Sequence, residues 1–109
     1  MHELALMESV VEEVLARTGD RRVALVRLEI GELAGVVADA MRFSFDVCTA
    51  GTRLEGAVLD IVRVAGRARC NQCGSEQPMP AYGLPCTCGS FDRHLVTGDE
   101  LRVKEAEVE

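Results

Sequence analysis

Four cysteines within one short stretch of the chain constrain its fold more than any other feature. They form two pairs, each followed directly by a glycine, and the residues are Cys70, Cys73, Cys86 and Cys88. Two cysteine pairs separated by a short loop are typical of tetrahedral zinc, because each pair can supply two thiolates from one tight turn. Four thiolates leave no open coordination position, so we expect a structural zinc ion whose binding helps this stretch to fold.

The second pair is shorter than usual, because only Thr87 separates Cys86 from Cys88. Zinc-binding pairs normally have two or more intervening residues. Three alternatives therefore stay open: His94 as a replacement ligand, a strained disulfide between Cys86 and Cys88, or unconnected thiols. We favour zinc over a disulfide because the protein is expected in a reducing compartment. The first residues lack the basic segment of a signal peptide. A cytoplasmic protein is then expected, and in the cytoplasm thiols stay reduced.

The residues around these pairs, 66–95, differ in composition from the rest of the chain. They contain all three prolines and show no sustained helical or strand periodicity. Such a stretch cannot bury a core of its own, so it needs a metal ion to fold. We therefore predict a zinc-ribbon-like subdomain with four cysteine ligands, inserted into a larger domain that residues 1–65 and 96–109 form.

The flanking segments have the periodicity of regular elements. Apolar residues at steps of three and four predict a helix whose stripe runs from Glu3 to about Leu15 and which Gly19 closes. Alternation predicts a strand from Arg22 to Ile30. The remaining elements are a second helix capped by Asp39 and ending before Gly51, with Cys48 buried on its inner face, a strand over residues 57–64, and a last strand around Leu101 and Val103. These elements predict an α+β fold, a small mixed α/β domain with two helices on a three-stranded sheet.

Charge and hydropathy argue against two classes of partner. The net charge is −6, and an acidic surface repels phosphate backbones, although Arg63, Arg67 and Arg69 form a small basic cluster. No stretch approaches the roughly 20 apolar residues that a membrane helix needs. We therefore expect neither nucleic acid nor a membrane as partner.

The start of the chain offers a second group of metal donors. The amine of Met1, the amide nitrogen of His2 and its imidazole can chelate one ion in adjoining rings. Nitrogen donors in one plane favour Ni(II) or Cu(II), and Glu3 offers an oxygen or a second amide nitrogen. A lone histidine is usually only solvated, so these residues by themselves leave metal binding here as a hypothesis.

Several motifs together resemble the hydrogenase maturation factors of the HypA and HybF family. They occur in one order along nearly the whole chain: Met1-His2-Glu3, Ile30-Gly31-Glu32, Phe43-Ser44-Phe45, and the late cysteines followed by Cys88-Gly89-Ser90. The resemblance implies a nickel-binding α/β domain with an inserted zinc ribbon. It also implies a nickel metallochaperone, not an enzyme, that serves [NiFe]-hydrogenase maturation and in some members urease.

The resemblance further implies ligands and partners. His2 would be the principal nickel ligand, assisted by the Met1 amine and by Glu3, and the four cysteines would bind zinc. The expected partners are a HypB-type GTPase and the precursor of the [NiFe]-hydrogenase large subunit, with the chain itself a monomer or a weak homodimer.

Two other classes of function are consistent with the cysteines alone. A zinc-ribbon adaptor that binds protein or nucleic acid without nickel needs only the cysteine pairs, and His2 would then be incidental. A thiol oxidoreductase would use Cys70 and Cys73, but this pair lacks the strand-then-helix context that activates such thiols.

Overall fold

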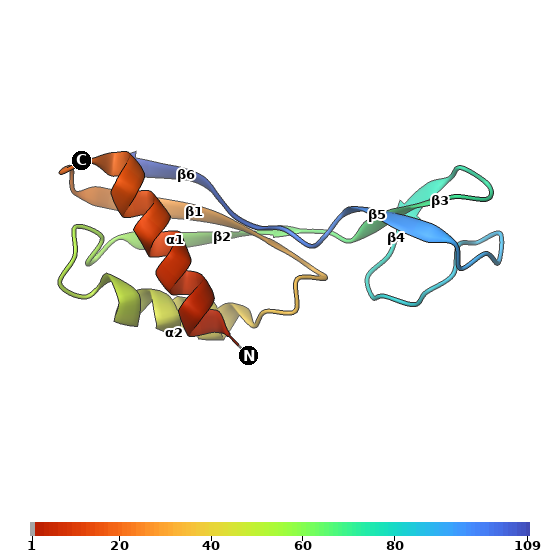
Figure 1. Cartoon of the computed structure of the whole chain (residues 1–109), viewed down its shortest axis with the longest axis horizontal. Coiled ribbons are helices and arrows are strands. Elements are labelled where there is room, and N and C mark those ends of the chain that lie inside the picture. The colour runs from red at the N-terminus through yellow and green to blue at the C-terminus, as the bar shows by residue number, and fades with distance from the viewer. Residues whose placement is uncertain (1) are drawn as a thin grey trace. The chain divides into compact units, whose positions relative to one another are not determined.

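The computed structural model describes residues 2–109 and has the predicted α+β fold (Figure 1). The elements in chain order are α1 (Glu3–Thr18), β1 (Val23–Gly31), α2 (Ala38–Thr49), β2 (Val58–Val64), β3 (Arg67–Cys70), β4 (Glu76–Pro78), β5 (Arg93–Thr97) and β6 (Leu101–Val108). Two three-stranded sheets result, with the orders β2-β1-β6 and β4-β3-β5. The predicted order of helix, strand, helix, strand, insert and strand is therefore confirmed.

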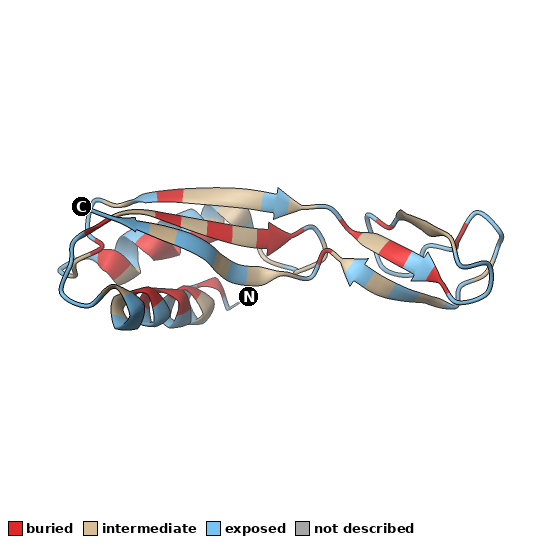
Figure 2. Cartoon of the chain, turned by 90° about the horizontal axis from the view of Figure 1, so that it is seen from above, coloured by how far each residue is buried: buried red, intermediate tan, exposed pale blue. Residues whose placement is uncertain are grey.

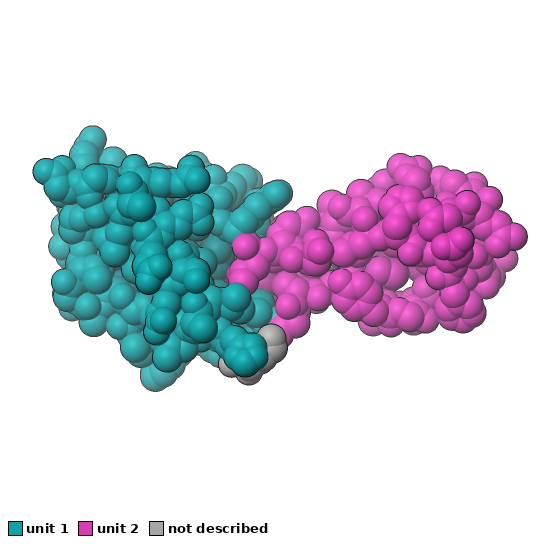
Figure 3. All heavy atoms as spheres, in the orientation of Figure 1, with its two compact units in different colours: residues 1–29, 36–62, 102–109 teal, residues 30–35, 63–101 magenta. Residues whose placement is uncertain are grey.

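The chain divides into two compact units (Figure 3). The first comprises residues 1–29, 36–62 and 102–109, and the second comprises residues 30–35 and 63–101. The second unit thus includes the loop after β1 as well as the cysteine-rich stretch. The predicted domain limits, 66–95 for the insert, stay a proposal.

In the first unit both helices cover one face of the β2-β1-β6 sheet (Figure 2). β1 lies in the centre, and its alternate residues Val26, Leu28 and Ile30 are fully buried, as the alternating pattern predicts. On the helices, Met7 and Met41 are equally buried. The opposite face of the sheet is polar, because Arg27 there pairs with Asp60 at 2.7 Å and also with Glu105.

Helix α1 ends at Thr18, and Gly19 follows it with a φ of 63°, as predicted for the residue that closes the helix. A guanidinium from outside the helix holds this end. Arg53 donates to the carbonyl of Leu15 at 2.9 Å and to Thr18 Oγ1 at 3.0 Å. A cation at the carbonyl end of a helix stabilises it, both through these hydrogen bonds and through the helix dipole.

Two details of helix α2 differ from the prediction. Its N-cap is Val37, with no side-chain cap, so the predicted cap at Asp39 is wrong. The Val37 amide donates to the Glu3 carboxylate at 3.2 Å, so an acidic side chain from another helix satisfies the amide of the N-cap residue. Cys48 is half-buried where full burial was predicted, because it lies in a groove beside Leu4 at the outer edge of the two helices.

The second unit contains strands that the sequence did not predict. β3 pairs with β4 and with β5, both antiparallel, and the pairing with β5 has an irregularity between Arg67 and Ala68. These strands are three to five residues long, which is too short to show a period.

Three glycines allow very close backbone contacts in this unit. A Cβ on Gly31 would lie 2.0 Å from the carbonyl oxygen of Gly98, and one on Gly66 would lie 2.2 Å from the carbonyl oxygen of Met79. No side chain fits at these distances. Leu33 packs against Gly66 in the same place.

Within the described residues, neither helix is both long and apolar enough to cross a bilayer.

Candidate functional site

The four cysteines of the two pairs lie together in the second unit. Their sulfur atoms all lie within 4.8 Å of one another, although the pairs are more than ten residues apart in the chain. Cys70 Sγ is 3.7 Å from Cys88 Sγ, and Cys73 Sγ is 3.6 Å from Cys86 Sγ. A tetrahedral zinc ion with Zn–S bonds of about 2.3 Å requires sulfurs about 3.8 Å apart. The cluster therefore fits such an ion.

The alternatives to a four-thiolate site do not match this geometry. All five cysteines are free thiols, so Cys86 and Cys88 form no disulfide. His94 is not among the four clustered residues, and its Nδ1 lies 2.6 Å from the Asn71 side-chain oxygen. The four sulfurs could thus hold a metal such as zinc without a histidine.

Backbone amides prepare one cysteine of each pair, Cys70 and Cys86, to bind a metal as a thiolate. The amides of Gln72 and Cys73 each donate to Cys70 Sγ at 3.4 Å, from the turn that follows β3. The Cys73 amide above all lowers the pKa of Cys70 to about 6. The pKa of Cys86 is likewise lowered, chiefly by the Cys88 amide. Thiolates stabilised in this way bind a cation with less proton release.

The outer side of the first turn is fixed by a chain of side chains. Asn71 donates from its amide nitrogen to Asp92 at 2.9 Å and contacts His94 with its oxygen. Its backbone amide also donates to the Asp92 carbonyl at 2.9 Å. The turn is therefore attached to the start of β5.

The second turn is attached to β4 by a residue that sequence reasoning missed. Gln77 accepts from the Thr87 amide at 3.2 Å and donates to Thr87 Oγ1 at 2.8 Å. Only the three-dimensional structure brings these residues together, since a lone glutamine ten positions before a threonine carries no sequence signal.

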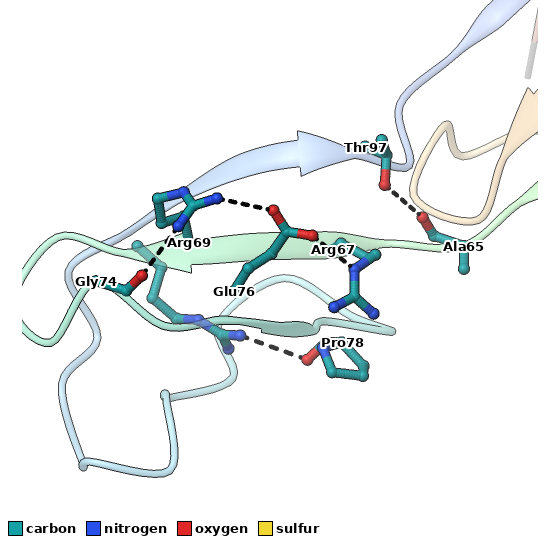
Figure 4. Close-up of polar contacts among 8 residues, drawn as sticks. Ala65, Arg67, Arg69, Gly74, Glu76, Pro78 and Thr97 are labelled. Atoms are coloured by element: carbon teal, nitrogen blue, oxygen red, sulfur yellow. Dashed lines mark hydrogen bonds and ion pairs between the residues drawn. The ribbon is translucent and has the colours of Figure 1, made fainter.

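Two arginines of the basic cluster noted in the sequence, Arg67 and Arg69, share one acidic partner on the same sheet (Figure 4). Glu76 of β4 pairs with Arg67 at 3.0 Å and with Arg69 at 3.1 Å. Arg69 also donates to the Gly74 carbonyl at 3.0 Å, which follows the first cysteine pair. These ion pairs join β3 to β4 across the position where the metal ligands begin.

At the other candidate site, His2 is exposed and occupies the N-cap position of α1. Its carbonyl accepts from the Leu6 amide at 2.9 Å, so the helix begins directly after it. Met1, the third predicted donor, lies outside the described residues. An exposed imidazole at a helix start is accessible to an ion from solution.

Glu3, the residue after His2, is buried at 7% exposure. Its carboxylate accepts from the Val37 amide, and amide hydrogen bonds from its own backbone and then from Val37 lower its pKa. Glu3 therefore holds the first residue of α1 against the start of α2 as an ionised group.

Within residues 2–109, the only group of three or more His, Cys, Asp or Glu side chains close enough to share an ion is the cysteine cluster. The structure does not bring further such side chains to His2 and Glu3. A chelate at the chain start that uses backbone nitrogens does not require them.

Comparison with known proteins adds the family. Residues 1–108 match the HypA model, described as a metallochaperone for hydrogenase and urease nickel incorporation. Hydrogenase maturation factor HypA of Geobacter metallireducens is 53% identical over the full length of both chains. That of Trichormus variabilis is 46% identical over all of this chain and 96% of its own.

A solved structure has a similar fold. The solution structure of the Ni metallochaperone HypA from Helicobacter pylori matches with a TM-score of 0.70, at 24% identity, over 99% of this chain and 97% of its own. Together with the family match over the whole chain, the α+β fold and the four clustered cysteines, this leads to one assignment. The chain belongs to the HypA family of nickel metallochaperones for hydrogenase and urease nickel incorporation.

Proposed function

We propose that this chain binds Ni(II) at its N-terminus, with His2 as principal ligand and the Met1 amine and Glu3 assisting. The observation that carries the proposal is the exposed imidazole of His2 directly before a buried, hydrogen-bonded Glu3. Nickel is the cargo in this proposal. The exposed His2 can take up and release the ion, while the buried Glu3 keeps the chain start in place.

The helix start favours the chelate chemically. The first amides of a helix have no acceptor within it. The amide of His2 can therefore release its proton to solvent and bind nickel through its nitrogen without the loss of a helical hydrogen bond. Amine, amide nitrogen and imidazole then donate in adjoining rings, as Ni(II) prefers. Because the amine and imidazole must be deprotonated, nickel binding weakens in acid.

The four cysteines are proposed to hold structural zinc, which orders the second unit by binding across both turns. Delivery is proposed to involve a HypB-type GTPase and the [NiFe]-hydrogenase large-subunit precursor, in the cytoplasm. An exposed, few-ligand nickel site lets a partner displace the donors one at a time. Family membership supports this part of the proposal.

Nickel titration of His2→Ala tests the proposal. The chain has two histidines, so His94→Ala is the matched control: it also removes an exposed imidazole, one that lies in the second unit. The untagged protein and both variants are titrated with Ni(II) in a calorimeter. Far-ultraviolet circular dichroism and zinc content serve as checks of the fold.

We expect His2→Ala to lose nickel binding while His94→Ala retains it, with helix content and zinc unchanged in both. Unchanged nickel affinity of His2→Ala would refute the N-terminal site. A zinc-ribbon adaptor would bind no nickel in any variant, and a blocking tag on the N-terminus would leave its function intact.

A further inference from the structure

The second cysteine pair poses a geometric problem. Zinc-binding pairs usually have at least two residues between the ligands, and here only Thr87 intervenes. Nevertheless Cys86 and Cys88 place their sulfurs 3.6 and 3.7 Å from those of the first pair. Backbone hydrogen bonds close this turn, from the Gly89 amide to the Cys86 carbonyl and from the Cys86 amide to the Ser90 carbonyl, both at 2.8 Å. The shortened segment between the two ligands also has contacts from outside the turn.

The two turns differ in how they are held. In the first, two amides of the turn itself, those of Gln72 and Cys73, donate to Cys70 Sγ. In the second, the Gly89 amide donates to the Cys86 carbonyl at 2.8 Å. The Thr87 amide donates to Gln77 on β4.

Gln77 contacts Thr87 at two points. Its Oε1 accepts from the Thr87 amide at 3.2 Å, and its Nε2 donates to Thr87 Oγ1 at 2.8 Å. Nε2 also donates to Ser75 Oγ at 2.8 Å, which fixes the orientation of the amide group. The same Oε1 lies 3.6 Å from Cys86 Sγ. A glutamine thus fastens both the backbone and the side chain of the single residue between the two ligands.

We propose that Gln77 is the positioning residue that compensates for the shortened second pair and so sets the geometry and lifetime of the metal bound by the four cysteines. This inference rests on the proposed metal binding at that cluster. The role requires an acceptor and a donor on one planar group, which only an amide of this length supplies. Leucine offers neither, and a glutamate would add negative charge beside the thiolates.

The neighbouring residue on β4 provides a matched control. Glu76 pairs with Arg67 and Arg69 and with neither cysteine turn (Figure 4). Glu76→Gln therefore weakens the same short strand without touching Thr87. A loss that comes only from a weaker sheet should appear in both variants, whereas loss of positioning should appear in Gln77→Leu alone.

The experiment measures metal release from the full-length, zinc-loaded protein into excess chelator, for the wild type, Gln77→Leu and Glu76→Gln. The bound zinc is then replaced by cobalt(II). The ligand-field absorption bands of the cobalt ion report the coordination geometry of the four-sulfur site. We expect release from Gln77→Leu to be at least about ten-fold faster, as for other outer contacts of metal ligands, with shifted cobalt bands. Glu76→Gln should release zinc within about two-fold of the wild type and keep its cobalt spectrum.

A rescue variant sharpens the test. One glycine inserted between Thr87 and Cys88 gives the second pair the usual spacing. In this background, Gln77→Leu should change the release rate by less than about two-fold, because the longer turn no longer needs the support. If Gln77→Leu does not fold, Thr87→Val replaces it, since valine removes Oγ1 and keeps the amide; release should then still be several-fold faster.

The outcomes separate the two proposals. A wild-type protein that holds no metal on its cysteines would overturn the proposed metal site itself. Metal in the wild type with equal release rates and equal cobalt spectra for Gln77→Leu would overturn only the role of Gln77. Equal acceleration in Gln77→Leu and Glu76→Gln would also overturn that role, and so would an undiminished effect of Gln77→Leu after the insertion.

Discussion

Replacement of Gly31 by alanine tests whether direct backbone contact holds the end of β1 against the chain that follows β5. A Cβ at Gly31 would lie 2.0 Å from the Gly98 carbonyl oxygen. Ordinary carbon–oxygen contacts are no closer than about 3.3 Å, so the two segments would have to separate by roughly 1.3 Å.

Two hydrogen bonds cross this contact and set the magnitude. The Gly31 amide donates to the Glu100 carbonyl at 2.7 Å, and the Leu33 amide donates to the Gly98 carbonyl at 2.6 Å. A separation of that size breaks both. Because Gly31 and Gly98 are buried, each bond left unmade costs about 1–3 kcal/mol, and the total is about 4 kcal/mol.

Hydrogen exchange measured by mass spectrometry shows this loss of stability as lower amide protection in the peptides around the contact. A loss of about 4 kcal/mol corresponds to a fall in amide protection of several hundred-fold, up to the limit set by the stability of the unit. The fall should appear in peptides that contain the amides of residues 31 and 33, which are the donors of the two bonds. Helix α1 lies in the first unit and serves as the internal reference.

Gly51→Ala is the control for backbone strain without a clash. Gly51 has a φ of 76°, and a Cβ there would meet no atom within 4 Å. The alanine should cost about 1–2 kcal/mol through its left-handed conformation and leave protection at Leu33 unchanged. Wild-type protection at Leu33 in Gly31→Ala would refute the reasoning, because it would mean that the backbone accommodates the methyl group freely.

Two further predictions concern the helices of the first unit. Arg53 donates to the carbonyls of Leu15 and Arg21 at 2.9 and 2.7 Å, so Arg53→Ala should lower the free energy of unfolding by about 2 kcal/mol in urea titrations followed by circular dichroism; an unchanged midpoint would contradict this. Burial, and then the charge of Glu8, raise the pKa of Cys48, so less thiolate forms at a given pH. Alkylation of Cys48 in the zinc-loaded protein should therefore be slower than that of free cysteine near about pH 8, and Glu8→Gln should speed it up; a slower rate in that variant would count against the charge effect.

The large elements were predictable because their side chains repeat with the period of the backbone. Val26, Leu28 and Ile30 alternate along β1 and are all buried. Helix α1 begins at Glu3 as predicted, but Leu4, the first residue of the predicted apolar stripe, is exposed. The end of α1 was predictable as well, because Gly19 follows its last turn, but the contact by which Arg53 stabilises that turn from a distant part of the chain was not. The periodicity of apolar residues along the helix cannot indicate a contact with such a distant residue.

The errors at α2 have the same origin. Asp39 has the residue type of a cap, but α2 begins before it, at Ala38, and the amide of its N-cap Val37 donates to the Glu3 carboxylate, 34 residues away. Cys48 lies on an apolar stripe, yet it faces a groove between the two helices rather than the core. A single-sequence pattern shows which face of a helix is apolar but not how completely the neighbouring helix covers it.

The four cysteines of the candidate metal cluster were predictable, but the contacts that hold their turns in place were not. Cysteine spacing is local and explicit, so the sequence identified the four thiols that the structure brings within 4.8 Å. The three strands around them are too short for a period and depend on cross-strand ion pairs, such as those of Glu76 with Arg67 and Arg69. The contacts of Gln77 with Thr87 were invisible for the same reason.

The position of His2 at a helix start has a consequence for the proposed nickel site. The N-terminal end of a helix carries about half a positive charge, which repels a divalent cation. The ionised Glu3 next to it opposes that repulsion, but its carboxylate also accepts from the Val37 amide. The electrostatic field at the start of α1 therefore attracts a nickel ion less strongly than the field of a cluster of free carboxylates would. A carrier must give up its cargo, so an ion bound by a few nitrogen donors against the field of α1 is in a suitable position for transfer to a partner with more ligands.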